Sequence, residues 1–197
     1  MTAISDVSVV LASSSPRRRD LLNLIGVAHE VRPANVDETY REGEEAAAHA
    51  ERLAREKALN GAASSSESLV VGADTIVVVD GRVLGKPRDA EDAAVMLKLL
   101  RGRTHVVMTA MAVAFGGRMV SCVEKVSVTF RDLSDDEIDA YIDTGEPMDK
   151  AGAYGIQGYG ATIVRRVDGD YFAVMGLSLV RLVALMAELD VAYDFAR

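Results

Sequence analysis

Hydroxyl and guanidinium side chains are concentrated in one short segment, Ser13–Arg19, with the sequence SSSPRRR. The segment follows the apolar, β-branched run Val7–Ala12 and precedes a stretch with helical spacing, so a strand should lead into a helix here. A helix N-terminus favours anions because its free N–H groups and its dipole face the ligand. Arginine adds paired donors that match phosphate oxygens. The segment is therefore a candidate phosphate site, and the alternative is a capped surface helix with solvated arginines.

A second candidate is a carboxylate inside a long apolar run. Asp74 lies within Leu69–Val79, whose sequence is LVVGADTIVVV. A carboxylate in a buried strand is costly unless it is paired, bound to a metal or open to a cleft. Asp74 is either a general base or metal ligand, or an aspartate that caps a turn. We expect the strand to be interrupted at Gly72–Thr75.

Two later segments carry polar side chains suited to a nucleotide. Lys86 lies between a glycine and a proline, and its ammonium would suit a phosphate, although an isolated lysine here would be an exposed turn residue. The segment Asp149–Gly158 is rich in glycine, which lets a backbone approach a ligand closely. Its Gln157 offers both a donor and an acceptor, as recognition of a base requires. The alternative is a flexible surface loop, but apolar Tyr154 and Ile156 favour inward packing of part of it.

The composition argues against a nucleic-acid-binding protein. With 22 basic and 30 acidic residues the net charge is −8, and only 5% of the residues are aromatic, with no tryptophan. Proteins that bind a nucleic-acid backbone usually present a basic face and stacking aromatics. A small phosphorylated ligand needs only a local cationic pocket, so it remains compatible with this charge.

Other reactive residue types predict no further site. The three histidines lack metal-ligand spacing, and no Ser/His/Asp arrangement is recognisable. The single cysteine, Cys122, is expected in the core; it excludes an internal disulfide and fits a reducing cytoplasm. The apolar segment Val106–Phe115 is shorter than the ~20 residues that cross a bilayer, and the N-terminus lacks a signal-peptide pattern. We therefore expect a cytoplasmic protein with no membrane partner.

The elements that must position these candidates alternate between helices and strands. Periodicity predicts strands at 7–12, 29–32, 69–79, 82–84, 104–115 and 119–130, and helices at 16–25, 44–60, 89–101, 134–144 and after 178. N-caps are expected at Ser15, Asp89, Ser134 and Ser178. Gly61 should end the second helix, Ser64–Ser66 and Glu146–Gly160 should be loops, and Ile163–Val174 should be a hairpin turning at Asp168–Gly169. This mixture predicts an α/β fold with a long mixed sheet and flanking helices, as one domain over 1–197 or two lobes around one cleft.

Five motifs occur in one order along the chain: LASSSPRRRDLL at 11–22, AREKA at 54–58, VGADTIV at 71–77, GKP at 85–87 and DKAGAYGIQG at 149–158. Together they resemble the Maf family of nucleotide pyrophosphatases, over nearly the whole chain. The resemblance implies an elongated fold related to inosine triphosphate pyrophosphatases, with a central cleft. It also implies hydrolysis of a nucleoside triphosphate to monophosphate and pyrophosphate with a divalent metal, Mg²⁺ or Mn²⁺, and a homodimer.

The resemblance also assigns roles to individual residues. Asp74 would be the catalytic acid/base. The residues that would bind phosphate are Ser13, Arg17, Arg18, Lys57 and Lys86. Glu38, together with Asp74, would serve the metal or the attacking water.

The choice of base is implied by three positions, Arg17, Thr75 and Gln157. Asp–Thr followed by Ile–Gln–Gly resembles the subfamily that takes dTTP, UTP and related pyrimidine nucleotides, modified ones included. The sister subfamily, which takes 7-methyl-GTP, typically has glutamine after the aspartate, so Thr75 argues against it. The alternatives are that sister activity and a nucleotide-binding regulator of cell division. The two acids, Asp74 and Glu38, favour an enzyme over a pure binding protein.

Overall fold

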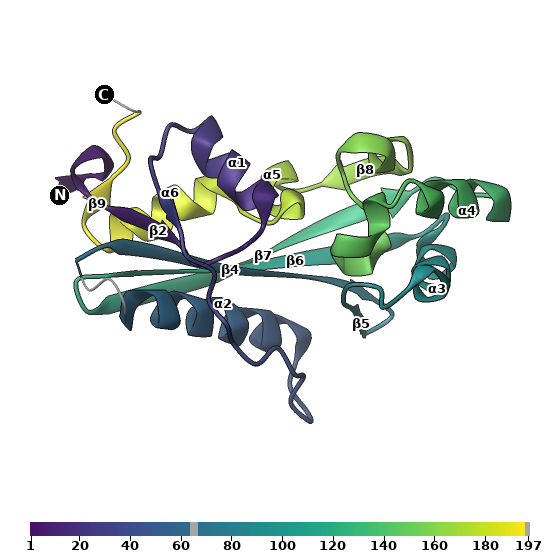
Figure 1. Ribbon diagram of the computed structural model, residues 1–197, viewed down its shortest axis with the longest axis horizontal. Coiled ribbons are helices and arrows are strands. Elements are labelled where there is room, and N and C mark those ends of the chain that lie inside the picture. Colours follow the sequence, from purple (N-terminus) through teal and green to yellow (C-terminus); the bar gives the residue numbers. More distant parts are fainter. Residues whose placement is uncertain (64–66, 196–197) are drawn as a thin grey trace. The chain divides into compact units, whose positions relative to one another are not determined.

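The computed structural model describes residues 1–63 and 67–195, so the loop predicted at Ser64–Ser66 lies outside the described residues. The chain divides into two compact units, and its elements are labelled in Figure 1. Unit 1 comprises Met1–Asp74, Thr109–Glu124 and Gly176–Arg197, and unit 2 comprises Thr75–Met108 and Lys125–Met175.

The strands confirm the predicted mixed sheet. They are β1 (Thr2–Ala3), β2 (Val9–Leu11), β3 (Glu30–Val31), β4 (Leu69–Val79), β5 (Arg82–Leu84), β6 (Thr104–Phe115), β7 (Arg118–Phe130), β8 (Val164–Asp168) and β9 (Val191–Ala192). The order in the large sheet is β3-β2-β4-β6-β7-β8, with β5 paired to β4. Strand β2 runs parallel to β3 and β4, whereas β5 and β8 are antiparallel to their partners. Strands β1 and β9, which the sequence did not predict, form a separate parallel pair.

The helices α1, α3, α4 and α6 begin directly after the N-caps predicted for them, whereas α2 begins two residues later than predicted and α5 was not predicted. They are α1 (Pro16–Leu24), α2 (Ala46–Ala63), α3 (Ala90–Leu100), α4 (Asp135–Asp143), α5 (Tyr171–Met175) and α6 (Leu179–Glu188). Asp89 accepts a hydrogen bond from the Asp92 N–H, Ser134 and Glu137 form a capping box, and Ser178 caps α6. In the described part of the chain, no helix combines the length and apolar character needed to cross a membrane.

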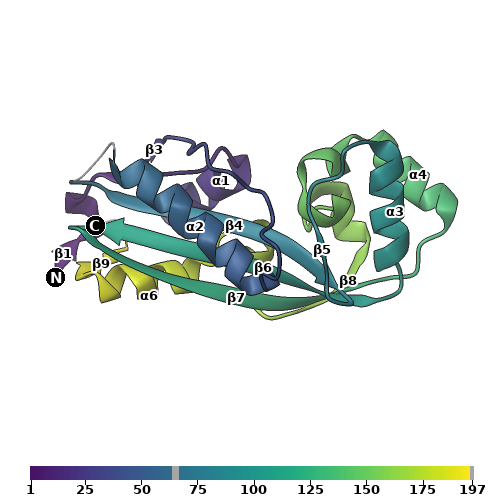
Figure 2. The same cartoon turned by 90° about the horizontal axis from the view of Figure 1, so that it is seen from below.

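In unit 1, α2 covers one face of the strands and α1 and α6 cover the other (Figures 1 and 2). Strand β4 is continuous, so the interruption predicted at Gly72–Thr75 is wrong. Gly72 is needed for close packing against α2, because a Cβ there would lie 2.6 Å from the Ala58 backbone nitrogen. The prediction that Gly61 ends the helix is also wrong: Gly61 lies inside α2, where a Cβ would be 2.7 Å from Val70 Cγ1.

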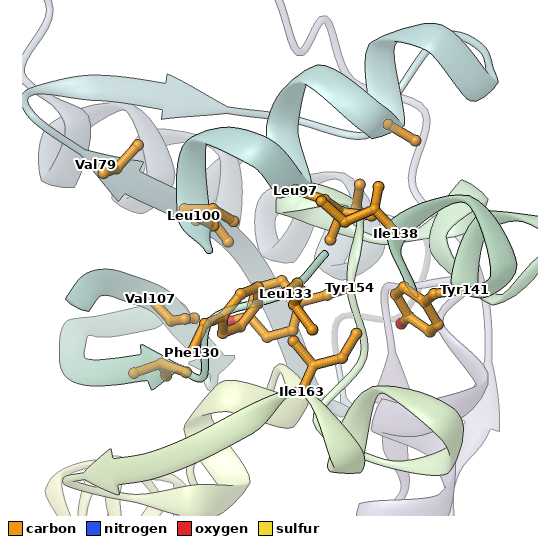
Figure 3. Close-up of a cluster of buried hydrophobic side chains, with 14 of the residues drawn as sticks. Val79, Leu97, Leu100, Val107, Phe130, Leu133, Ile138, Tyr141, Tyr154 and Ile163 are labelled. Carbon is orange, nitrogen blue, oxygen red and sulfur yellow. The ribbon is translucent and has the colours of Figure 1, made fainter. Parts of the chain in front are cut away.

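Unit 2 has its own hydrophobic cluster, in which Leu97 of α3 and Ile138 of α4 lie side by side above the aromatic rings (Figure 3). The rings of Phe130 and Tyr154 meet edge to face at 4.6 Å, and His105 packs edge-on against both. His105 Nε2 hydrogen-bonds the Tyr154 hydroxyl at 2.7 Å, and burial lowers the pKa of His105 to about 4. His105 is therefore a neutral core residue, as the lack of metal-ligand spacing suggested.

Two predictions for the end of unit 2 are corrected by the structure. The hairpin expected at Ile163–Val174 does not form: β8 pairs with β7, and α5 follows in place of a second strand. Asp170 explains the change, because its carboxylate accepts a hydrogen bond from the Phe172 N–H and starts a helical turn. The predicted loop at Glu146–Gly160 contains short 3₁₀ helices at Glu146–Asp149 and Ala151–Ala153, and another begins at Gly158.

Candidate functional site

The turn between β2 and α1 brings Ser13 and Arg18 together in unit 1. Pro16 opens the helix and Ser15 is the N-cap, as predicted, although its side chain makes no capping hydrogen bond. The Ser15 N–H donates to Ser13 Oγ at 3.3 Å, and Arg18 Nη1 donates to the same oxygen at 2.9 Å. The hydroxyl of Ser13 is thus a fixed, buried part of the turn.

Arg18 is buried and ties three parts of unit 1 together. Its Nε donates to the Gly176 carbonyl at 2.8 Å, and its Nη1 donates to the Ala73 carbonyl at 3.0 Å. Burial lowers the pKa of Arg18, and the nearby charge of Asp74 opposes this shift. Arg18 therefore places a buried positive charge next to β4, the strand that carries Asp74.

The three arginines point in different directions, as expected for consecutive helical positions. Arg18 is buried, Arg17 is half-buried and Arg19 is exposed. Arg19 lies 3.6 Å from Asp20 in a solvated pair. Of the three, Arg17 has the intermediate exposure that suits direct contact with a ligand at the helix start.

Lys57 joins the two acidic residues singled out from the sequence. Its Nζ lies 2.8 Å from Asp74 Oδ1 and 2.7 Å from Glu38 Oε1. The side chains of Lys57 and Asp74 are only 10% and 12% exposed, whereas that of Glu38 is 62% exposed. The contact is possible because Gly72 lets α2 approach β4 closely. One ammonium therefore holds two carboxylates together, one buried in the strand and one on the solvent side.

The segment that carries Glu38 is anchored by residues that sequence reasoning missed. Arg52 of α2 donates to the Thr39 carbonyl at 3.2 Å and forms an ion pair with Glu44 at 2.7 Å. The hydrogen bond from Arg52 lowers the pKa of Glu44 to about 2. The Tyr40 ring stacks on His49 at 4.2 Å. The sequence carries only a weak signal for this anchor, since charged residues are also expected on the solvent-exposed face of an ordinary helix.

The other three predicted site residues, Thr75, Lys86 and Gln157, belong to unit 2. Thr75 is half-buried and follows Asp74 in β4, while Lys86 and Gln157 are exposed. The turn of Lys86 contacts the glycine-rich segment, because the Gly152 N–H donates to the Gly85 carbonyl at 3.0 Å. The structure thus links the GKP and DKAGAYGIQG motifs within one unit.

Known proteins similar to this chain match it over nearly its full length. A family model described as "Maf-like protein" matches residues 8–189. The chain belongs to the Maf-like family. A Shigella sonnei protein named dTTP/UTP pyrophosphatase is 49% identical over 184 residues, which cover 93% of each chain. An Escherichia coli K12 protein of the same name is 48% identical with the same coverage.

Structural comparison places this Maf-like chain beside HAM1 proteins. The solved structure of a HAM1 protein from Coxiella burnetii has a TM-score of 0.50 and 14% identity, covering 92% of this chain and 99% of that one. At this identity the similarity concerns the fold alone. It agrees with the predicted relation to the inosine triphosphate pyrophosphatase fold.

The acidic residues of this Maf-like chain offer a small set of metal ligands. Among residues 1–63 and 67–195, no group of three or more His, Cys, Asp or Glu side chains could hold a metal ion. Asp74 and Glu38 contribute two carboxylates that meet at Lys57. Mg²⁺ is commonly held by one or two carboxylates plus water and substrate phosphates, so this pair fits a cation that arrives with a nucleotide.

Proposed function

We propose that this Maf-like protein hydrolyses dTTP, UTP and related pyrimidine nucleoside triphosphates, modified ones included, to the monophosphate and pyrophosphate. The observation that carries the proposal is that the ammonium of Lys57 contacts the carboxylates of both Asp74 and Glu38. The 49% identity to a protein named dTTP/UTP pyrophosphatase supports the choice of substrate. The proposed catalytic domain is the whole chain, because residues of both units lie within the family match at 8–189.

In this proposal the β2–α1 turn binds the phosphates. The start of α1 supplies a positive dipole end, Ser13 supplies a hydroxyl, and Arg17 contacts phosphate oxygens directly. Arg18 adds a buried positive charge to this turn, and Lys86 is proposed as a further phosphate ligand. These cations offset the negative charge of the triphosphate locally, which is compatible with a net charge of −8 for the whole chain.

Asp74 and Glu38 are the proposed ligands of a divalent cation, Mg²⁺ or Mn²⁺. When bound, such an ion would neutralise phosphate charge and polarise the phosphoryl group. Lys57 keeps the Asp74 carboxylate oriented through their 2.8 Å contact. Asp74 accepts a proton as the water oxygen attacks the α phosphorus, and the bond from that phosphorus to the α–β bridging oxygen breaks. The electron pair of the broken bond leaves with pyrophosphate.

Thr75 and Gln157, with Arg17, are proposed to select the base. The Gln157 amide has a donor and an acceptor, and a uracil or thymine base presents an N3–H donor next to an O4 acceptor. Gln157 is exposed, so its amide is accessible to a ligand. The proposed partners are the nucleotide and its cation, and the net charge of −8 argues against a nucleic acid.

We expect dTTP and UTP to yield nucleoside monophosphate and pyrophosphate in the presence of Mg²⁺ or Mn²⁺. A panel of triphosphates with chromatographic resolution of the phosphate products checks this result. Release of diphosphate and orthophosphate would refute attack at the α phosphorus. Turnover of 7-methyl-GTP far above UTP would assign the sister activity, and nucleotide binding without turnover would favour a regulator.

Replacing Arg17 or Lys86 with alanine should lower kcat/KM for UTP by about 10- to 100-fold, the usual effect of losing a charge-assisted hydrogen bond. Neither side chain is in the buried core, so the melting temperature should stay near that of the wild type. Arg19→Ala is the matched control, because it removes the same charge from an exposed position on the same helical turn and should leave turnover unchanged. A melting temperature that collapses while activity per folded molecule persists would make these residues structural.

A further inference from the structure

The segment that carries Gln157 is wound around the carboxylate of Glu146. Glu146 Oε1 accepts hydrogen bonds from the Tyr141 hydroxyl at 2.8 Å and from the Gly160 N–H at 2.9 Å. Glu146 Oε2 accepts from the Tyr159 N–H at 2.8 Å. The Tyr141 hydroxyl in turn accepts from the Gly155 N–H at 3.0 Å. Backbone groups before and after Gln157 are therefore fixed to the same pair of side chains.

The glycines around Gln157 are explained by this anchor. A Cβ at Gly158 would overlap Glu146 Oε2, and one at Gly155 would lie 3.1 Å from Glu146 Oε1. A Cβ at Gly160 would overlap the Gly155 carbonyl oxygen and would lie 2.9 Å from the Tyr141 hydroxyl oxygen. These glycines were expected to let the backbone approach a ligand closely, and the structure shows that Gly155 and Gly158 lie close to Glu146. The three glycines thus let the segment pack closely against itself and against Glu146 and Tyr141, and Gln157 lies between Gly155 and Gly158.

Glutamate is specifically suited to the centre of this anchor. Although burial alone would raise the pKa of Glu146, the hydrogen bonds from Gly160, Tyr141 and Tyr159 bring it below its usual range. Burial also raises the pKa of Tyr141, so its hydroxyl stays protonated and donates a hydrogen bond to Glu146. The three groups that hydrogen-bond to the Glu146 side-chain oxygens are donors, and an ionised carboxylate is acceptor-only. A glutamine amide would place its own N–H donors against one of them.

The anchor holds the apolar side of the segment inward and leaves the amide outside. Tyr154 and Ile156 are buried, whereas Gln157 is exposed. A glutamine on a loose segment can rotate to match either a uracil edge or a cytosine edge, because the two bases present opposite donor and acceptor orders. The amide can still turn about its terminal torsion, so the backbone sets where the amide meets the base, and a fixed 155–160 backbone limits it to one approach.

We propose that Glu146 is the positioning residue for base selection, holding the 155–160 backbone so that Gln157 prefers a uracil or thymine edge over a cytosine edge. The inference rests on the proposed function, since it assumes that Gln157 contacts the base. Glu146 itself touches no substrate. Replacing Glu146 is therefore expected to change the ratio of kcat/KM between nucleotides more than it lowers kcat/KM for all of them.

The test compares kcat/KM for UTP and CTP in the wild type, Glu146→Gln, Gln157→Ala and the double variant, with Mg²⁺. We expect Glu146→Gln and Gln157→Ala each to lower the UTP:CTP ratio by about 10-fold, the scale of one lost recognition hydrogen bond. The double variant should show no further fall, because coupled residues are not additive. Asp143→Asn, the same chemical change at an exposed residue of α4, should leave the ratio unchanged.

A second variant covers the case in which Glu146→Gln does not fold. Tyr141→Phe keeps the buried ring and removes only the hydroxyl that joins Gly155 to Glu146, so the ratio should fall in the same direction by a smaller factor. A lower melting temperature with an unchanged ratio in both variants would overturn the inference and make the anchor purely structural. Additive effects with Gln157→Ala would also overturn it. A wild type that cleaves no pyrimidine triphosphate would instead overturn the proposed function, a result visible before any variant is made.

Discussion

Asp74→Asn should lower the turnover of UTP by about 10²- to 10⁴-fold, the usual cost of losing a general base. Asparagine keeps the size of the side chain and can still accept a hydrogen bond from Lys57, but it lacks the negative charge and the basic oxygen. Affinity for a nucleotide should persist or increase, because a negative charge beside the phosphates is removed. Turnover of UTP, affinity for its α,β-methylene analogue and melting temperature, measured on one preparation, check these expectations.

The structure predicts that this variant folds. Lys57 retains its 2.7 Å contact with Glu38 when the charge of Asp74 is lost, so no buried ammonium is left without an anion. Asp80→Asn is the matched control: Asp80 follows the same strand, is exposed and pairs with Arg103, so this variant should keep full turnover. Near-normal turnover of Asp74→Asn would reject Asp74 as the catalyst. A large fall in melting temperature with a proportionate loss of activity would make Asp74 a structural residue.

Helix caps and tight turns were predictable from the sequence because the residues that form them are close along the chain. Asp89, Ser134 and Ser178 cap helices through donors three residues later. The Asp80–Gly81 turn joins β4 to β5 with both residues at positive φ, as an Asp–Gly hairpin requires. The hairpin predicted beyond β8 failed because one residue, Asp170, started a helix in place of a second strand.

Contacts between distant residues were not predictable. The cost of burying Asp74 implied a partner, but Lys57 is 17 positions away, and only the packing of α2 on β4 brings the two together. Glu146 was missed for the same reason, since its backbone donors lie 13 and 14 positions later. The glycines between them were visible in the sequence, but nothing local distinguishes a glycine that admits a ligand from one that admits a neighbouring carboxylate. The family resemblance, not the spacing, assigned Glu38 and Lys57 to one site.

Arg18→Met should reduce the free energy of unfolding by roughly 3–5 kcal/mol, the scale of removing one partner from a buried charged network. The guanidinium donates to the carbonyls of Gly176 and Ala73 and to Ser13 Oγ, all in buried surroundings. Methionine fills much of the volume but donates to none of them, so the two carbonyls lose these hydrogen bonds, and Ser13 Oγ keeps only the one from the Ser15 N–H. Chemical denaturation with matched m-values measures this loss.

Arg17→Met and Arg19→Met are the matched controls, because they make the same substitution on the same helical turn. We expect both to unfold at nearly the wild-type denaturant concentration, since Arg17 is half-buried and Arg19 is exposed. Arg17→Met should lose turnover, and Arg19→Met should lose neither turnover nor stability. If Arg18→Met unfolds like the wild type but is inactive, the guanidinium serves the phosphates alone. The expected pattern instead divides three adjacent arginines into one that holds the turn, one that contacts the ligand and one that lies on the solvent-exposed surface.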